Sequence, residues 1–339
     1  MSGCLEYVIN ETSTGSMLAV WNGTTKGEAE DRWRLLSALV AFLIGGTALV
    51  LNAVVLLTLI VSKELRQNTH HNLVLCLSIS DLILGLSMCV GGLRLFTPQW
   101  ATFYVPCVMT SVLFISSITL SFCQTFLISF HRYLKISESV LDKKLLQNNR
   151  KYAIYIVFWL VVLGFNISMV HYRHVAEKLP FCKFKCVFGN RYPIMIIYFQ
   201  SMTILLLTLI IVFYVLTICR MRQRYRRTFA WQANQNGNSS NTSHEMTTLP
   251  YSGNDQLTQH MNKKLFGSMK LIGFIITALL ICTGPMVIAS FFESLTQKQL
   301  FIVATLSCLN SVVNPFIYAF NIEKLRRELK SICHIINIF

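Results

Sequence analysis

One acidic side chain, Asp81, lies inside a long apolar stretch of the sequence, and its carboxylate is the first candidate for chemistry. If that stretch crosses a lipid bilayer, an ionisable group there is costly, and its usual meaning is functional. Small polar residues at helical spacing occupy other apolar stretches; they are Asn52, Ser121, Asn310, Ser311 and Asn314. If these faces converge on Asp81, their oxygen atoms can hold a small hard cation such as Na⁺. The alternative, which the residue types alone favour, is a polar network that joins helices.

The composition decides what kind of protein must position these groups. Of the 339 residues, 53% are hydrophobic and only 13% are charged, against about 25% charged residues in soluble domains. Lys and Arg number 30 against 15 Asp and Glu. Such basicity suggests a nucleic-acid partner, but that function needs a basic face on a water-soluble body. The apolar excess argues against such a body, so we predict a membrane protein with no nucleic-acid partner.

Seven runs with few or no charged residues reach the roughly 18 residues that indicate a transmembrane helix. They span residues 35–61, 71–93, 102–130, 152–170, 192–219, 271–292 and 299–322. Spanning β-strands would alternate in polarity over about 10 residues, whereas these runs are apolar on all sides. Only helices satisfy their own backbone polar groups in lipid. The sequence therefore predicts an all-α membrane protein, a seven-transmembrane helix bundle over residues 35–322.

The basic residues predict the orientation of this bundle. Of the 30 Lys and Arg residues, 20 follow the first, third and fifth runs or lie in the tail 323–339. The positive-inside rule therefore places the tail in the cytoplasm and the segment 1–34 outside the cell. Asn10 and Asn22 begin N-glycosylation sequons in that outer segment. We expect a multi-pass protein of the plasma membrane.

Two cytoplasmic segments have compositions of their own. Residues 223–264 are polar and contain many Asn, Ser and Gly residues, which predicts a disordered loop. In the tail, Leu325 and Leu329 lie on one side of a strongly charged sequence. This pattern predicts a short amphipathic helix on the inner leaflet.

Four of the 11 cysteines lie outside the membrane in this topology, in an oxidising compartment; they are Cys4, Cys107, Cys182 and Cys186. Cys107, at the outer start of the third run, can attach the loop that precedes the fifth run. We favour Cys186 as its partner over Cys182. A bond between Cys4 and Cys182 is a weaker alternative.

Residues in all seven runs resemble the signature positions of rhodopsin-like (class A) G-protein-coupled receptors. The matching residues are Asn52, Leu77-Ser-Ile-Ser-Asp81, Cys107, His131-Arg132-Tyr133, Trp159, Tyr214, Pro285 and Asn314-Pro315-Phe-Ile-Tyr318. Each motif alone is a weak signal. Their occurrence in order over seven runs is highly specific.

The resemblance implies a role for each matched residue. Asp81, with Ser121, Asn310, Ser311 and Asn314, falls where the family holds an allosteric sodium ion, which reverses the preference for a plain network. Arg132, flanked by His131 and Tyr133, matches the arginine that meets the G protein. Tyr214 and Tyr318, the latter after Asn314-Pro315, match tyrosines that move on activation. The implied partners are a heterotrimeric G protein and arrestin, no cofactor beyond Na⁺ is implied, and Cys333 is a candidate for palmitoylation.

Several positions depart from the family pattern. The family usually has Asp where this chain has His131, and the second acid that restrains the arginine would fall near Leu265. A protonated His131 would repel Arg132. This suggests that the inactive conformation is only weakly stabilised and that basal signalling is high. The alternative is that apolar packing latches the helices. The family's tryptophan in the sixth run is Thr283 and its proline in the fifth is Leu206, so the relay from ligand to G protein must differ.

The resemblance also assigns a ligand pocket, lined by Phe114, Ile118, Tyr198, Met202, Met286, Val287, Ser290, Ala304 and Cys308. This lining is mostly apolar, and methionine makes it adaptable. Phe114 stands where an amine receptor needs a carboxylate, and the seventh run has no lysine for retinal. These features argue against a monoamine and exclude light sensing. Basic residues above the pocket favour an amphipathic ligand with an anionic part, such as a lipid acid or an acidic peptide, unless they only solvate the surface.

Three other functional classes are alternatives to a signalling receptor. A transporter would show several ionisable groups along a path or paired broken helices, and the runs contain one acid and no repeat. An intramembrane enzyme needs a nucleophile with a base, or metal ligands, at mid-membrane, and the runs provide neither, so no enzymatic activity is expected. A ligand-scavenging or arrestin-only receptor would share the fold and differ only in its output.

Overall fold

The computed structural model describes residues 19–66, 69–97, 103–137, 150–171, 184–238, 270, 273–292 and 296–336. Within these ranges the backbone is helical almost throughout, apart from short turns and a single bridge residue at Phe103. The prediction of an all-α membrane protein is confirmed.

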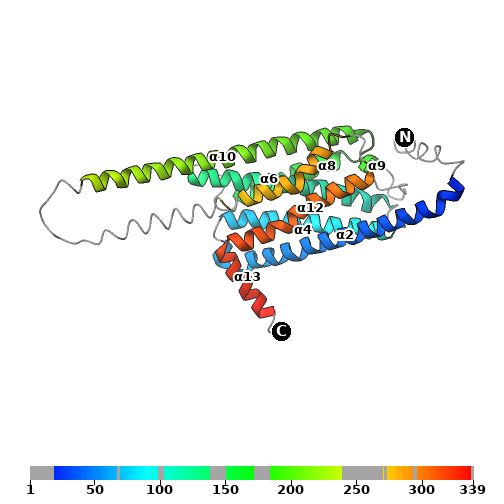
Figure 1. The fold of residues 1–339 in the computed structure, drawn as a ribbon, viewed down its shortest axis with the longest axis horizontal. Coiled ribbons are helices and arrows are strands. Elements are labelled where there is room, and N and C mark those ends of the chain that lie inside the picture. The colour runs from blue at the N-terminus through cyan, green and yellow to red at the C-terminus, as the bar shows by residue number, and fades with distance from the viewer. Residues whose placement is uncertain are drawn as a thin grey trace.

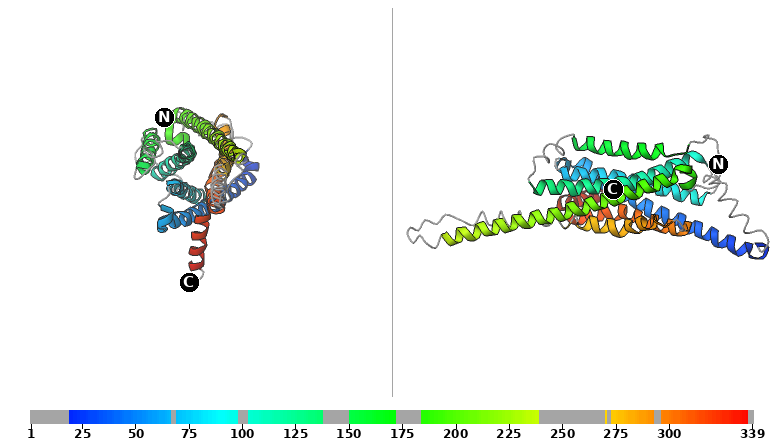
Figure 2. Two further views of the ribbon diagram at one scale, coloured as in Figure 1. Left: turned by 90° about the vertical axis from the view of Figure 1, so that its left-hand side faces the viewer. Right: turned by 90° about the horizontal axis from the view of Figure 1, so that it is seen from above.

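The long helices lie side by side along one direction, and the end-on view shows them arranged around a common axis (Figures 1 and 2). They are α2 (Ala19–Val61), α4 (Thr69–Phe96), α6 (Tyr104–Ile136), α8 (Arg150–Ser168), α10 (Tyr192–Asn238), an unlabelled helix Gly273–Ala289, and α12 (Gln297–Asn321). Shorter elements connect or follow them; these are α3 (Lys63–Arg66), α9 (Phe184–Phe188), the 3-10 turn η1 (Gly189–Arg191) and α13 (Glu323–Ile336).

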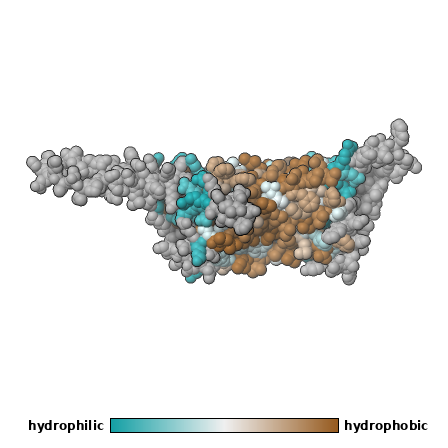
Figure 3. Space-filling model, turned by 90° about the horizontal axis from the view of Figure 1, so that it is seen from below, coloured by the Kyte–Doolittle hydropathy of each residue, from teal (hydrophilic) through white to brown (hydrophobic). Residues whose placement is uncertain are grey.

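The surface of the bundle is that of a membrane protein. On the face shown in Figure 3, apolar residues cover the middle of the bundle and hydrophilic residues flank them on both sides. Five helices are long and apolar enough to cross a bilayer, and the helices Tyr152–Ser168 and Gly273–Ala289 are shorter apolar ones. Large apolar side chains such as Leu43 and Phe320 point outward. In water such a surface would be unstable, whereas lipid tails solvate it at no cost.

Two helices continue past their predicted limits. Helix α2 begins at Ala19, within the predicted extracellular segment 1–34. Helix α10 runs to Asn238, so the prediction of disorder from residue 223 is wrong for residues 223–238. Arg and Gln are good helix formers, and the sequence offers no Gly or Pro after Pro193 until Gly237. Residues 239–264 of the predicted loop lie outside the described residues.

Two glycines set the distance between α2 and α4. A Cβ atom on Gly45 would lie 2.8 Å from the backbone oxygen of Gly85, and one on Gly85 would lie 2.9 Å from the oxygen of Gly45. Since real Cβ atoms do not approach so closely, only glycine permits this contact. Small residues have the same effect at helix interfaces in membranes generally. Gly85 lies one turn beyond Asp81, so this close contact brings α2 to the carboxylate.

Helix α13 begins directly after α12 and leaves the bundle sideways (Figure 2). Its Leu325 is fully buried and its Leu329 packs partly on the same cluster, while Lys324 and Arg326 are exposed. The predicted amphipathic helix is confirmed. An apolar face turned to the bundle and a charged face turned away suit a position at the inner leaflet.

Candidate functional site

Asp81 is the centre of the candidate site. Its side chain is 0% exposed. The Ser311 hydroxyl donates a hydrogen bond to Oδ1 at 2.6 Å, and the Asn314 amide donates one to Oδ2 at 2.9 Å. Both donors lie on α12, one turn apart, so the helical spacing seen in the sequence brings them to one carboxylate.

The other predicted members of the network surround this pair. The Asn52 amide donates to the backbone oxygen of Ser311 at 2.8 Å and to that of Ala48 at 2.9 Å. The Asn310 amide approaches the Ser121 hydroxyl at 3.5 Å. Side chains from α2, α4, α6 and α12 therefore take part in neighbouring polar contacts at this part of the bundle.

The atoms of this site fit a small hard cation. A carboxylate offers about four acceptor positions, and the two hydrogen bonds to Asp81 occupy only two of them. Three buried amide oxygens nearby, the Oδ1 atoms of Asn52, Asn310 and Asn314, have no hydrogen-bond partner. Unsatisfied buried acceptors are costly, and oxygen atoms are the ligands that such cations prefer. No cluster of three or more His, Cys, Asp or Glu that would suit a transition metal occurs in the described residues.

Arg132 lies near the inner end of α6 with no acidic partner among the described residues. In those ranges the one ion pair joins Arg34 and Asp31 at 3.2 Å, at the opposite end of the bundle. The Arg132 Nε atom is buried without a hydrogen-bond partner. His131 is buried next to it, and the Leu265 position lies outside the described residues.

Apolar packing holds the inner ends of the helices together. We call this set the inner apolar cluster; it contains Val55, Leu59, Leu65, Leu73, Val74, Leu77, Leu127, Ile128, Ile275, Tyr318, Ile322 and Leu325. Tyr318 is fully buried in it, and its hydroxyl has no hydrogen-bond partner. Ile275 brings the Gly273–Ala289 helix into the same cluster. Among the described residues, the contacts that join the inner ends are therefore mainly apolar.

Two further tyrosines, Tyr133 and Tyr214, do not belong to this cluster, and Tyr214 packs against a second apolar cluster described below. The Tyr214 hydroxyl lies 2.9 Å from where a Cβ atom of Gly273 would be, so a larger residue there would require the tyrosine side chain to shift. The Tyr133 ring lies 5.5 Å from the Phe213 ring. Phe213 also contacts Phe130 at 5.1 Å, a link that the sequence motifs did not reveal.

The predicted pocket residues are only partly gathered into one place. Phe114, Ile118 and Cys308 are buried in a second apolar cluster, and Met202 and Ala304 pack partly against it. Val287 is buried and Met286 is half-buried, without belonging to that cluster.

Two other predicted pocket residues, Tyr198 and Ser290, do not belong to that cluster either. The Tyr198 ring packs on Phe165 of α8, with ring centroids 3.8 Å apart. The Ser290 hydroxyl donates to the backbone oxygen of Val287 at 2.6 Å.

Two residues that the sequence analysis missed also line this region. The Phe184 ring lies 6.4 Å from the Phe114 ring, and the Gln200 amide donates to the backbone oxygen of Ser290 at 2.7 Å. Phe184 precedes Cys186 by two residues, and a bond from Cys186 to α6 would have brought it here. Gln200 carried no comparable signal. Arg191, one of the basic residues expected above the pocket, donates to the backbone oxygen of Ser168 at 2.6 Å.

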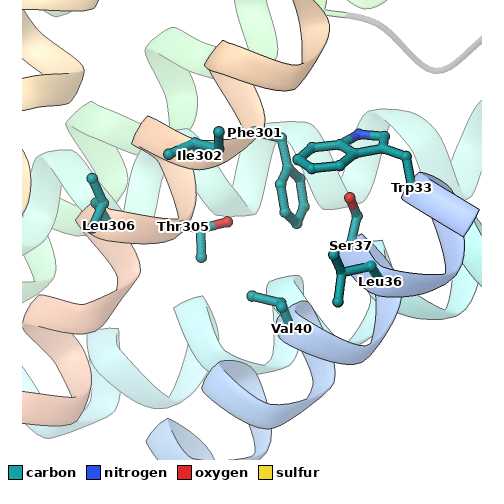
Figure 4. Close-up of a pocket in the computed structure, with 8 residues that line it drawn as sticks. All are labelled: Trp33, Leu36, Ser37, Val40, Phe301, Ile302, Thr305 and Leu306. Carbon is teal, nitrogen blue, oxygen red and sulfur yellow. The ribbon is translucent and has the colours of Figure 1, made fainter.

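A separate cavity lies between the outer ends of α2 and α12 (Figure 4). Its volume is about 180 Å³, and it is lined by Trp33, Leu36, Ser37, Val40, Phe301, Ile302, Thr305 and Leu306. None of these residues belongs to the predicted pocket. They come from the two ends of the chain, so no local sequence pattern joins them.

Only some of the predicted disulfide, glycosylation and lipidation residues lie within the described ranges. Cys107 and Cys186 are both disulfide-bonded and lie in the same apolar cluster, and the Tyr104 hydroxyl donates to the backbone oxygen of His171 at 2.6 Å nearby. Asn22 lies on α2 and Cys333 on α13. The remaining candidates lie outside the described residues; they are Asn10, Cys4 and Cys182.

The sequence is similar to those of known receptors. The profile of the family "7 transmembrane receptor (rhodopsin family)" matches residues 51–318. The cannabinoid receptor type 1B of Takifugu rubripes is 24% identical over 89% of this chain, and the match spans 63% of that receptor's length. Thyrotropin-releasing hormone receptors of Ovis aries and Bos taurus are each 23% identical over 96% of this chain and 84% of their own length.

Proposed function

Since this chain belongs to the rhodopsin family of seven-transmembrane receptors, we propose that it is a plasma-membrane receptor that converts binding of an extracellular ligand into activation of a heterotrimeric G protein. Its N-terminus faces the exterior and its C-terminus the cytoplasm. The distribution of Lys and Arg residues supports this orientation.

The observation that carries the proposal is the arrangement at the inner end of the bundle. Arg132 has no acidic partner in the described ranges, and Tyr318 is buried with an unsatisfied hydroxyl. A buried polar group without a partner favours any conformation that satisfies it. Moving the inner end of the Gly273–Ala289 helix away would let Tyr318 leave the inner apolar cluster and would open a cavity next to Arg132. A G protein that binds this open form stabilises it.

The ligand acts on the same equilibrium from the other end. It can shift the receptor only by its differential affinity for the two forms. The predicted pocket lies mainly in an apolar cluster that includes Phe114 and Ile118, which supports an amphipathic ligand over a monoamine. The relatives are named for cannabinoids and for thyrotropin-releasing hormone, so their names do not agree on a class. We propose a lipid-like or peptide ligand with an anionic part.

The polar site at Asp81 regulates this change in our proposal. Na⁺ bound between the carboxylate and the unpartnered amide oxygens of Asn310 and Asn314 would link α4 to α12. Linking these helices stabilises the closed form. The ion therefore acts as an allosteric ligand and supplies no catalysis.

The resting state is held by packing rather than by charge. The inner apolar cluster contains residues of α2, α4, α6, the Gly273–Ala289 helix and α12. Since no carboxylate among the described residues pairs with Arg132, we predict ligand-free signalling above that of mock-transfected cells. Second-messenger levels equal to the mock control at matched surface expression would contradict this prediction.

The function is tested by measuring G-protein dissociation in transfected cells that are exposed to lipid and peptide libraries. The expected result is a response that the Arg132→Ala variant loses while its surface expression is unchanged. No response at rest or with any library, despite surface expression, would refute the proposal and favour the scavenging or arrestin-only alternative. Loss of glycan mass in the Asn10→Gln/Asn22→Gln variant tests the orientation, and an unmodified wild-type N-terminus would contradict it.

A further inference from the structure

The groove between the outer ends of α2 and α12 has the properties of a lipid site. Leu36 and Ile302 line it and are also exposed on the outer surface of the bundle, so the groove opens toward the membrane. Its volume of about 180 Å³ is below the roughly 300–1,000 Å³ of ordinary small-molecule pockets. A groove of this size holds part of a molecule whose remainder stays in the bilayer.

Two hydroxyl groups in this apolar groove have no partner. The Ser37 and Thr305 side chains are only 3% and 9% exposed, and neither hydroxyl oxygen makes a hydrogen bond. Figure 4 shows both hydroxyls directed into the space between the two helices. Helical Ser and Thr residues elsewhere in the chain commonly donate to the backbone oxygen one turn earlier, as Ser307 does to Val303 at 3.0 Å. A buried hydroxyl without a partner is costly, so an acceptor supplied from outside the chain at this groove would stabilise both side chains.

The outer end of the groove carries a cation and an aromatic cover. Lys298 Nζ lies 5.4 Å from the centre of the Trp33 ring, and that ring meets Phe301 edge to face at 6.2 Å. Trp is typical of the level where lipid headgroups begin. The Lys298 side chain is exposed, so its charge is available to a phosphate at that level.

The order of these features along the groove matches one class of molecule. Thr305 lies two turns below Lys298, or about 10 Å at 1.5 Å per residue, and Val40 and Leu306 continue the groove as an apolar channel. From the outer end inward, the groove therefore presents a cation, two hydrogen-bond donors and an apolar surface. A glycerophospholipid presents a phosphate, an ester carbonyl and an acyl chain in the same order.

We propose that this groove binds one glycerophospholipid of the outer leaflet, with its ester carbonyl accepting hydrogen bonds from Ser37 and Thr305. Its phosphate lies beside Lys298, one acyl chain follows Val40 and Leu306, and the second chain stays in the bilayer. The lipid joins the outer end of α2 to that of α12. Each of the two helices also contributes to the Asp81 network through Asn52 and Asn314, so lipid binding at the groove stabilises the same helix pair.

The test compares two lipids on the purified full-length receptor in detergent. Native mass spectrometry measures binding of dioleoyl phosphatidylcholine and of its ether-linked analogue, which lacks both carbonyl groups. The wild type is expected to bind the ester lipid about tenfold more tightly, because each of two net hydrogen bonds contributes roughly two- to twelvefold. The Ser37→Ala/Thr305→Val variant is expected to lose this preference. Because the preference is a ratio within one preparation, partial loss of folded protein does not alter it.

Matched variants complete the design. Ser307→Ala removes a buried hydroxyl of the same helix that already has a partner, and it is expected to keep the preference. Val40→Phe fills the groove and is expected to weaken both lipids, whereas Leu43→Phe, at a position 69% exposed on the same helix, is not. Equal binding of the two lipids by the wild type would overturn the proposal, as would an unchanged preference in the double variant. Displacement of the phospholipid by an equimolar free fatty acid would also overturn it. The measurement involves no signalling, so its failure leaves the proposed receptor function unaffected.

Discussion

Replacing Ile275 with alanine is expected to raise ligand-free signalling. Ile275 is buried near the inner end of the Gly273–Ala289 helix, where it packs in the inner apolar cluster together with Tyr318. The open conformation that we propose moves this end away from the cluster. The substitution therefore removes contacts from the closed form and leaves the open form nearly unchanged.

The size of the effect follows from the environment of Ile275. Truncating a buried Ile to Ala in a soluble core costs about 2–5 kcal/mol. About 2.4 kcal/mol of that is transfer of the lost carbon groups from water, at about 0.8 kcal/mol each. This contribution falls away in a bilayer, because lipid tails are as apolar as the side chain. The packing loss that remains, up to about 2.6 kcal/mol, shifts the closed-to-open ratio by a factor of up to about 80.

The assay is G-protein dissociation without ligand in cells that are matched for surface expression. Ile281→Ala is the control, since Ile281 lies on the same helix but is 68% exposed. Arg132→Ala in the Ile275→Ala background should abolish the signal and show that it passes through the G-protein site. The apolar latch would be refuted by unchanged basal signalling in Ile275→Ala, or by an equal rise in Ile281→Ala.

Three further substitutions test other parts of the structure. Asp81→Asn removes one carboxylate oxygen and the negative charge. Replacing Na⁺ by choline in the medium should therefore change ligand-free signalling of the wild type but not of the variant. An equal change in both would exclude a sodium site at this residue. Tyr318→Phe removes a buried hydroxyl that has no partner. The thermal stability of the receptor without ligand should therefore be unchanged or slightly higher, while the agonist response should fall. A clear loss of stability would show that this hydroxyl makes a hydrogen bond in the resting form. Non-reducing peptide mapping should find Cys107 joined to Cys186. Replacing both with serine should lower the free energy of unfolding by about 2–4 kcal/mol and reduce surface expression. A wild-type peptide that links Cys107 to Cys182 would contradict this pairing.

The sequence alone determined the fold and the centre of the candidate site. Seven apolar runs of sufficient length admit only helices in lipid, because a helix satisfies its own backbone polar groups. Helical spacing places Ser311 and Asn314 on one face of a helix, and the resemblance to the receptor family implied that this face meets Asp81. The acidic latch was predicted to be absent from the residue types at two positions, and among the described residues no acid pairs with Arg132.

Other features depend on contacts between distant parts of the chain and had no local signal. The predicted end of α10 was wrong, because the polar composition of residues 223–238 resembles that of a disordered loop, although the Arg and Gln residues in this segment are good helix formers. The assignment of Tyr198 to the pocket rested on position along one helix, whereas its ring direction depends on Phe165 of a neighbouring helix.

Hydropathy and helical periodicity are local properties of each segment. The amino-acid sequence therefore determines which segments span the membrane and which polar groups share a face of one helix. The depth of burial of Tyr318, the apolar latch around Ile275, and the pairing of Ser37 with Thr305 across one groove arise between segments. Each depends on how closely two helices approach and how they are rotated. Side-chain packing over the whole bundle sets both quantities, and for this reason only the tertiary structure decided them.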